Sequence, residues 1–175
     1  MPKLAQYKEC TGCMACVDSC SHNALQATLN EEGHIVPLID ESKCVNCKLC
    51  ERVCPVVSKL PYSQSPVASS FAGWAKDKVV RKNSATAGAF SALAQYVFSK
   101  GGVVCGASNV DGVLVKHICI EKVDELNKLQ GSKYTQSNAE GIYKTVSVNL
   151  KQGKLVLFSG TGCQVAGLYG YLGKR

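Results

Sequence analysis

The sequence predicts two consecutive units: a small, cysteine-rich unit of the α+β class and a larger α/β domain that is truncated before its sheet is complete. Eight of the eleven cysteines fall between residues 10 and 54. Proline and serine are concentrated in the segment that follows, which is typical of a linker. Beyond it, short apolar runs alternate with helical patterns. We therefore expect the first unit at residues 1–59, a linker at 60–69 and the second unit at 70–175.

The cysteines of the first unit form two runs with the same spacing, C-x2-C-x2-C-x3-C, and the second run lies 34 residues after the first. The second run ends in Cys54-Pro55, which completes the bacterial iron–sulfur signature, whereas the first ends in Cys20-Ser21. In such runs three cysteines bind one 4Fe-4S cluster and the fourth crosses to the other cluster. The spacing therefore predicts two 4Fe-4S clusters, one bound by Cys10, Cys13, Cys16 and Cys54 and the other by Cys44, Cys47, Cys50 and Cys20.

Two other uses of clustered cysteines fit this pattern less well. Zinc ribbons separate their cysteine pairs by a longer spacer and would leave the third cysteine of each triplet unexplained. A disulfide framework belongs to secreted chains, and residues 1–8 lack the pattern of a signal peptide. We therefore expect a cytoplasmic protein, and oxygen-labile clusters favour an anaerobic or low-oxygen host. The first unit resembles the two-cluster bacterial ferredoxins, which implies a ferredoxin-like fold over residues 1 to about 58.

The formal net charge of +7 overstates how basic the protein is. Four thiolates around each cluster contribute about −2, which lowers the total to roughly +3. The lysines are scattered, and no basic stripe is interleaved with aromatic residues, which argues against nucleic acid as a partner. No apolar run is long enough to suggest a membrane span. The remaining positive charge favours an anionic cofactor or an acidic electron-transfer partner.

Apolar periodicity predicts the individual elements. In the first unit we expect helical turns at 14–19 and 49–53, and two strands within 24–39 around a turn at 30–33. In the second unit we expect strands at 70–75, 103–107, 113–120 and 155–158, and helices at 89–100, 123–129, 139–152 and 164–172. Ser84 or Thr86 is the expected N-cap of the first long helix. Cys105 and Cys119 fall in strands, where we expect small buried apolar side chains.

Three loops of the second unit are rich in small and hydroxyl residues: Ser84–Gly88, Gly131–Tyr134 and Ser159–Cys163. The first precedes a helix, whose free N–H groups favour an anion. The third joins a strand to a helix, where α/β domains bind ligands. The middle loop adds a cation and an aromatic face. Small residues also serve as ordinary caps, so both uses stay open. The candidate ligand-binding residues are Ser84, Thr86, Ala87, Gly88, Ser132, Lys133, Tyr134, Gly160 and Thr161.

These loops, in matching order, resemble the coenzyme F(420) hydrogenase/dehydrogenase beta-subunit family. The resemblance covers residues 70–173 and is carried by the runs Asn83-Ser84-Ala85-Thr86-Ala87-Gly88-Ala89-Phe90, Gly131-Ser132-Lys133-Tyr134 and Gly160-Thr161-Gly162-Cys163-Gln164-Val165-Ala166-Gly167-Leu168. The resemblance implies an FAD site that exchanges electrons with iron–sulfur clusters and a deazaflavin or another organic substrate. Gly162 stands where the family commonly has proline, which loosens that loop.

Two further residues of the second unit are candidates for chemistry. Cys163 is the candidate catalytic residue, and three roles stay open for it: a reactive thiol, a flavin contact, or one ligand of a further iron–sulfur site. His117 could face the cofactor or be a strand histidine with its hydrogen bonds satisfied.

The function we predict is the iron–sulfur electron-transfer part of an FAD-dependent oxidoreductase. Electrons would pass between a carrier protein and FAD, and then a deazaflavin or another organic substrate. The alternative is a non-enzymatic, ferredoxin-type electron carrier whose second unit docks a partner. Flavin absorbance after anaerobic purification separates the two.

Overall fold

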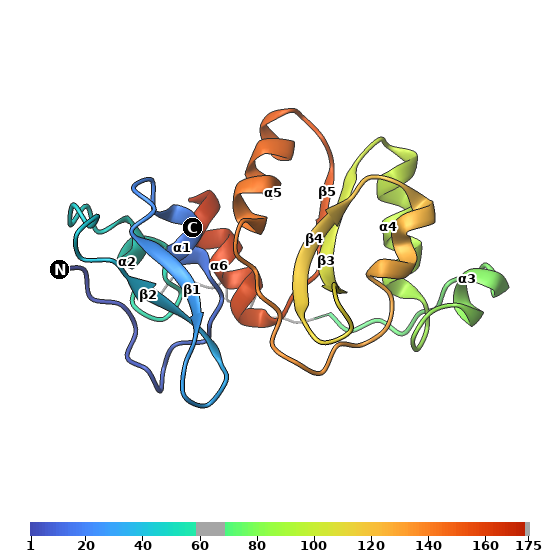
Figure 1. Cartoon of the computed structure of the whole chain (residues 1–175). Coiled ribbons are helices and arrows are strands. Elements are labelled where there is room, and N and C mark those ends of the chain that lie inside the picture. Colours follow the sequence, from blue (N-terminus) through green and yellow to red (C-terminus); the bar gives the residue numbers. More distant parts are fainter. Residues whose placement is uncertain (59–68, 174–175) are drawn as a thin grey trace.

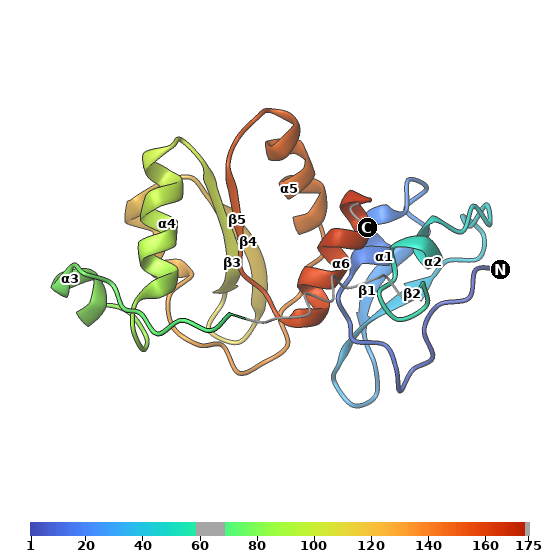
Figure 2. The ribbon, with the colours of Figure 1, turned by 180° about the vertical axis from the view of Figure 1, so that it is seen from behind.

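The computed structural model describes residues 1–58 and 69–173, so the predicted linker lies almost wholly outside the described residues. Two sheets are present among them, a two-stranded sheet in the first unit and a three-stranded sheet in the second. The chain is a mixed α/β protein in which the first unit and the second lie side by side (Figures 1 and 2).

The first unit consists of two one-turn helices and one hairpin. Helix α1 covers Ala15–Ser19 and helix α2 covers Leu49–Val53, and each lies inside one cysteine run. Strands β1 (Leu25–Leu29) and β2 (Ile35–Ile39) pair antiparallel, with Leu25 opposite Ile39. These elements confirm the positions that the spacing predicts.

The second unit is a three-layer arrangement around the sheet β4-β3-β5. Strands β3 (Val103–Asn109) and β4 (Val115–Ile120) pair antiparallel, and β5 (Val156–Phe158) pairs parallel with β3. Helix α4 (Ala89–Ser99) and the 3-10 helix η1 (Val123–Lys128) pack on one face. Helix α5 (Ile142–Lys151) packs on the other, and α6 (Gly162–Leu172) lies between the sheet and the first unit (Figure 1).

The start of the second unit differs from the prediction. The segment 70–75 is not a strand: Phe71 is exposed, and the Ala75 N–H donates to the Ala87 carbonyl in a loop. A short helix that the sequence analysis missed, α3 (Lys78–Lys82), follows it and is capped by the Asp77 carboxylate. Five residues are too few for an amphipathic period, so periodicity could not reveal this helix.

The N-cap expected for α4 is also wrong. Gly88, in the left-handed region with φ 73°, occupies the N-cap position, and no side chain caps the helix there. The Ser84 hydroxyl instead donates to the Val80 carbonyl and lies 2.7 Å from the Ser91 hydroxyl. Glycine is favoured here because the backbone is left-handed and because an added Cβ would lie 3.1 Å from the Ala75 Cβ.

One hydrophobic core joins the two units. It contains Met14 at the N-cap of α1 and Val17 within α1, together with Ile142, Tyr143 and Val146 of α5, all of them buried. A unit of fewer than sixty residues buries little apolar surface of its own, so packing on a neighbour supplies what it lacks. The second unit therefore forms part of the support for the cysteine runs.

Candidate redox site

The eight cysteines of the two runs are gathered into two groups around separate small cavities. We call Cys10, Cys13, Cys16 and Cys54 cysteine group I, and these four thiols line one cavity with apolar neighbours such as Leu4 and Pro37. Cys20, Cys44, Cys47 and Cys50 form cysteine group II and line the other. In each group three thiols come from one run and the fourth from the other. Four thiols around one small apolar space are a donor set that suits a 4Fe-4S cluster.

Burial differs between the thiols and controls their protonation. Cys13, Cys16 and Cys50 are buried, whereas Cys47 is exposed. Burial raises the pKa of the Cys13 thiol to about 11, and it also raises the pKa values of Cys16 and Cys50. These thiols are therefore protonated at neutral pH in the metal-free chain, and they must lose protons when they bind iron.

The backbone repeats its conformation in the two runs. Gly12 and Met14 in the first run and Asn46 and Lys48 in the second all lie in the left-handed region, with φ between 55° and 64°. Such turns direct consecutive backbone N–H groups toward one space, which suits an anionic cluster. The same curled loop is thus built twice, 34 residues apart.

A larger cavity of about 870 Å³, which we call the central cavity, lies where the first and second units meet. All three predicted loops contribute to its wall. Of the predicted residues, Ser84, Gly88, Ser132, Lys133, Gly160 and Thr161 line it. Thr86, Ala87 and Tyr134 do not, and the Tyr134 side chain is 96% exposed. The three loops therefore converge on one cavity, and six of the nine candidate residues line it.

The opposite wall of the central cavity comes from the first unit, which sequence reasoning did not foresee. Cys10 and Thr11, in the loop of cysteine group I, line the cavity together with Glu32 and His34 at the tip of the β1–β2 hairpin. Tyr7 also lines it and donates its hydroxyl to the Glu32 carboxylate. Cys10 thus belongs to both a cysteine group and the central cavity.

Polar residues near α4 form a continuous chain on the cavity wall. The Gln130 side-chain amide donates to the Ser91 hydroxyl at 3.0 Å, and the Ser91 and Ser84 hydroxyls lie 2.7 Å apart. The Ser84 hydroxyl donates onward to the Val80 carbonyl. Ser91 and Gln130 carry no motif in the sequence, but their spacing from Ser84 on the helix and the following loop brings them to one side of the cavity.

Lys133 places a positive charge at the cavity wall. Its ammonium group donates to the carbonyl oxygens of Gln130 at 2.7 Å and Lys128 at 3.4 Å. An ammonium group has three N–H donors, so one remains for a ligand. Partial burial lowers the pKa of Lys133. The side chain is therefore a brace for the loop after η1 as well as a candidate anion contact.

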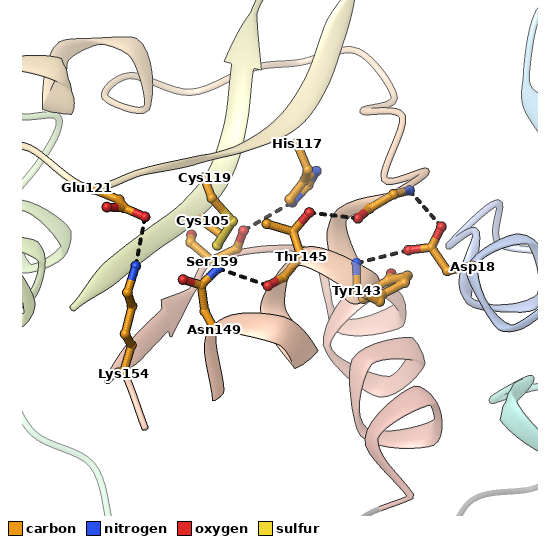
Figure 3. Close-up of a disulfide and its surroundings, with 11 residues drawn as sticks. Asp18, Cys105, His117, Cys119, Glu121, Tyr143, Thr145, Asn149, Lys154 and Ser159 are labelled. Atoms are coloured by element: carbon orange, nitrogen blue, oxygen red, sulfur yellow. Dashed lines mark hydrogen bonds and ion pairs between the residues drawn. A yellow bond between two sulfur atoms is a disulfide. The ribbon is translucent and has the colours of Figure 1, made fainter. Parts of the chain in front are cut away.

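His117 lines the central cavity and has both ring nitrogens in hydrogen bonds, of which Figure 3 shows the one to Ser159. Nε2 lies 3.1 Å from the Ser159 carbonyl oxygen, and Nδ1 lies 2.7 Å from the Ser137 hydroxyl. A carbonyl oxygen only accepts, so Nε2 carries the proton and Nδ1 of the neutral ring accepts from Ser137. Burial lowers the pKa of His117, which favours this neutral form. His117 is therefore a strand histidine with its hydrogen bonds satisfied, and it also lines the central cavity. That it faces a cofactor stays a prediction.

The loop that carries Cys163 lies between the central cavity and cysteine group I. Cys163 lines the cavity and packs against the core that contains Cys13. Its sulfur lies 3.1 Å from the Thr161 hydroxyl, and Thr161 and Gln164 form a capping box at the start of α6. Thr161, a predicted ligand residue, therefore has a structural role of its own.

Three contacts fix the loop of cysteine group I against the second unit. The Asp18 carboxylate accepts from the backbone N–H groups of Gly141 at 2.6 Å and Tyr143 at 2.9 Å (Figure 3). The Tyr143 hydroxyl donates to the Cys13 carbonyl at 2.6 Å. The Gln136 side chain both accepts from and donates to the backbone of Ile35, as a neighbouring strand would.

The strands of the sheet also contain a disulfide that was not expected. Cys105 and Cys119, predicted to be small buried apolar residues, face each other across β3 and β4 and are bonded (Figure 3). A two-residue turn at the predicted Asp111-Gly112 would place Cys105 opposite Ile118. The strands instead pair Asn109 with Val115, which centres the hairpin on Gly112 and brings Cys105 opposite Cys119. The predicted turn therefore could not reveal this pair.

Taken together, paired thiol groups beside a polar cavity define an iron–sulfur redox protein. Comparison with known families agrees with this class. Residues 9–57 match a 4Fe-4S dicluster domain, and residues 70–144 match the family described as coenzyme F420 hydrogenase/dehydrogenase, beta subunit N-term. Each match covers less than half of the chain. The two matched segments are similar to the same two families that the sequence resemblances name. A search of curated proteins found no match to the chain.

These matches support a redox role with 4Fe-4S clusters, electron transfer and a redox partner. The Ser159–Cys163 loop lies beyond the matched range, so its part in a ligand site stays a prediction. Among the described residues no helix is long and apolar enough to cross a membrane.

Proposed function

We propose that the chain is the iron–sulfur electron-transfer part of an FAD-dependent oxidoreductase, with FAD in the central cavity. The observation that carries this proposal is the composition of the cavity wall. Cys10 of cysteine group I lies on one side and the three small-residue loops lie on the other. The volume of about 870 Å³ is within the range of cofactor pockets, which is about 300–1,000 Å³.

Each part of the wall has a task in this proposal. Clusters supply one-electron transfer, and a bound flavin links it to two-electron chemistry on a substrate. The loops around Gly88 and Gly160 present backbone N–H groups at helix starts, where phosphate oxygens bind. Lys133 contributes its free N–H to the same anionic groups. His117, neutral and held by two hydrogen bonds, shapes the cavity without adding charge.

The two cysteine groups have different tasks because their surroundings differ. Cysteine group I shares Cys10 with the central cavity, so it faces the cofactor. Cysteine group II shares no residue with that cavity and includes the exposed Cys47. We place the contact with the carrier protein at group II, beside the exposed Val45 and Lys48. The working environment is a cytoplasm with little oxygen, and the substrate is a deazaflavin or another organic molecule.

Anaerobic titration of the reconstituted protein with FAD tests the proposal. We expect FAD fluorescence to be quenched on binding, and Ser132→Trp, which fills the cavity wall, to abolish the quenching. Val113→Trp is the matched control because Val113 is exposed and does not line the central cavity. If wild type contains both clusters but does not bind FAD, the proposal fails and the second unit is better explained as a docking module of an electron carrier.

A further inference from the structure

The Cys105–Cys119 disulfide lies directly behind the wall of the central cavity. Ala107 and His117 are opposite each other in the β3–β4 register, and both line the cavity. Cys105 and Cys119 are the next opposed pair on the same face of the sheet, because side chains two residues apart in a strand point the same way. Two residues of strand span about 7 Å. Cys105 itself is 0% exposed.

The disulfide also lies in the core that holds cysteine group I. Cys105, Cys119, Cys13 and Cys16 all belong to one packed cluster of side chains. Two aromatic residues of this cluster, Phe158 and Tyr143, offer a route between the disulfide and Cys13. Phe158 is the residue opposite Cys105 in the parallel β3–β5 pair, and its ring lies 6.1 Å from the ring of Tyr143. The Tyr143 hydroxyl donates to the Cys13 carbonyl at 2.6 Å.

We propose that Cys105 and Cys119 are a redox-active pair that exchanges two electrons with the 4Fe-4S clusters. In the reduction the Cys105–Cys119 sulfur–sulfur bond breaks, each sulfur takes one electron and one proton from water, and two thiols form. The reductant is a pair of reduced 4Fe-4S clusters, one per cysteine group, each of which is oxidised by one electron. In the reverse reaction the two thiols lose two electrons and two protons, the disulfide forms again, and each cluster is reduced by one electron.

The stoichiometry of the chain suits this role. Each reduced cluster gives up one electron, and a disulfide accepts two. The two clusters together therefore hold the number of electrons that reduces one disulfide. The inference rests on the clusters and not on FAD in the central cavity. The competing explanation is a purely structural disulfide, since a covalent bond between β3 and β4 stabilises the hairpin without any redox role.

Internal electron transfer separates these explanations. Both clusters are reduced anaerobically with reduced methyl viologen, the donor is removed at once by gel filtration, and the visible absorbance of the clusters is followed. We expect the absorbance to return as the clusters are reoxidised, while iodoacetamide labelling and mass spectrometry show free thiols appearing at Cys105 and Cys119. Cys163, which is not in a disulfide, is the internal labelling control.

Two variants test the route. In Cys105→Ala/Cys119→Ala the absorbance should stay low after the donor is removed, because the acceptor is absent. Phe158→Leu should slow the return of absorbance. Tyr171→Leu should not, because the Tyr171 ring also lies near that of Tyr143, at 6.0 Å, but Tyr171 does not pair with the disulfide strands. These readouts do not respond to a disulfide that only stabilises the hairpin.

Three results would overturn the inference. The first is free thiols at both positions in the oxidised protein before any reductant is added. The second is a disulfide that persists in wild type while the clusters stay reduced. The third is a return of absorbance in wild type that is no faster than in the double alanine variant. Protein without acid-labile sulfide would overturn this inference and the proposed function together, whereas a missing FAD site would leave the inference standing.

Discussion

The contact between Asp18 and helix α5 gives the sharpest test of how the two units depend on each other. Asp18 is 3% exposed and lies in α1 of the first unit. Its carboxylate accepts from Gly141, Tyr143 and, at 3.4 Å, Lys144 at the start of α5. The N-cap residue Gly141 has no side chain to do this. A residue more than 120 positions away therefore caps the helix.

The structure sets the size of the effect of Asp18→Ala. Loss of a helix cap costs about 0.5–2 kcal/mol. The Tyr143 N–H is buried, and an unsatisfied buried donor costs about 1–3 kcal/mol. Burial raises the pKa of Asp18, which shows that its own desolvation offsets part of the gain. We therefore expect a net destabilisation of about 3 kcal/mol. For a chain of this size that lowers the melting temperature by roughly 6–12 °C.

The assay compares anaerobic thermal and urea unfolding at matched scan rates, because cluster proteins often unfold irreversibly. Far-UV circular dichroism reports the helices and visible absorbance reports the clusters, and both transitions should move together. Iron content is measured first, since Asp18 lies between Cys16 and Cys20. Asp18→Asn keeps the side-chain shape and one acceptor oxygen, so it should lower the melting temperature less than Asp18→Ala does. Glu140→Ala is the matched control because Glu140 is an exposed carboxylate beside the same helix. Equal midpoints for Asp18→Ala and Glu140→Ala would refute the reasoning.

The remaining predictions test the cysteine groups, the interface and the cavity. Cys20→Ser should remove about half of the iron by emptying cysteine group II before group I, and equal loss at both would contradict the crossed grouping. Gly12→Ala should destabilise by more than about 1 kcal/mol because its Cβ would lie 2.4 Å from a backbone oxygen, whereas Gly33→Ala, with the same sign of φ and open space, should cost less in urea titrations. Because the folded pKa of His117 is below its unfolded value of about 6.5, stability should fall as pH drops from about 6.5 toward the folded pKa, and His117→Gln should remove that slope. Lys133→Ala should weaken FAD binding roughly ten- to a hundredfold without changing iron content, and an unchanged titration would remove Lys133 from the site.

Local spacing predicted much of the site, because the groups that share a loop or strand are fixed by chain geometry. The two cysteine groups, the hairpin and the strand–helix order follow from spacing and periodicity alone. The three loops converge on one cavity because they all end at the same side of the sheet. Thr86, Ala87 and Tyr134 were misplaced since a loop's composition does not say which side chains point inward.

Contacts between the units could not be read from periodicity. Gln136 pairs with Ile35 at a separation of 101 residues, and Glu32 and His34 reach the cavity from a hairpin that carries no ligand motif. Such contacts depend on how two surfaces dock, and a single sequence has no repeating signal for that. The Cys105–Cys119 pair depends on the hairpin register, because a shift of one residue at the turn would place Ile118 opposite Cys105.

Comparison of the two cysteine runs indicates which of them packs against the second unit, because equivalent positions share a backbone conformation but differ in their surroundings. Gly12 and Asn46 occupy equivalent positions with the same left-handed backbone, so backbone conformation alone does not demand glycine. Glycine is needed at 12 because a Cβ there would lie 2.2 Å from the Gln136 side chain.

The helices of the two runs differ in the same sense. Met14 and Val17 are buried against α5 and α6, whereas their equivalents Lys48 and Glu51 are polar. Where one cysteine run has an apolar residue or glycine and the other has a polar residue at the equivalent position, the run with the apolar residue or glycine is the one that the second unit covers there. By this comparison the second unit covers the first run at these two positions and leaves the equivalent positions of the second run uncovered. Other residues of the second run, Cys50 and Val53, are buried in the shared core. The covered first run is the one whose cysteine group I lies beside the central cavity.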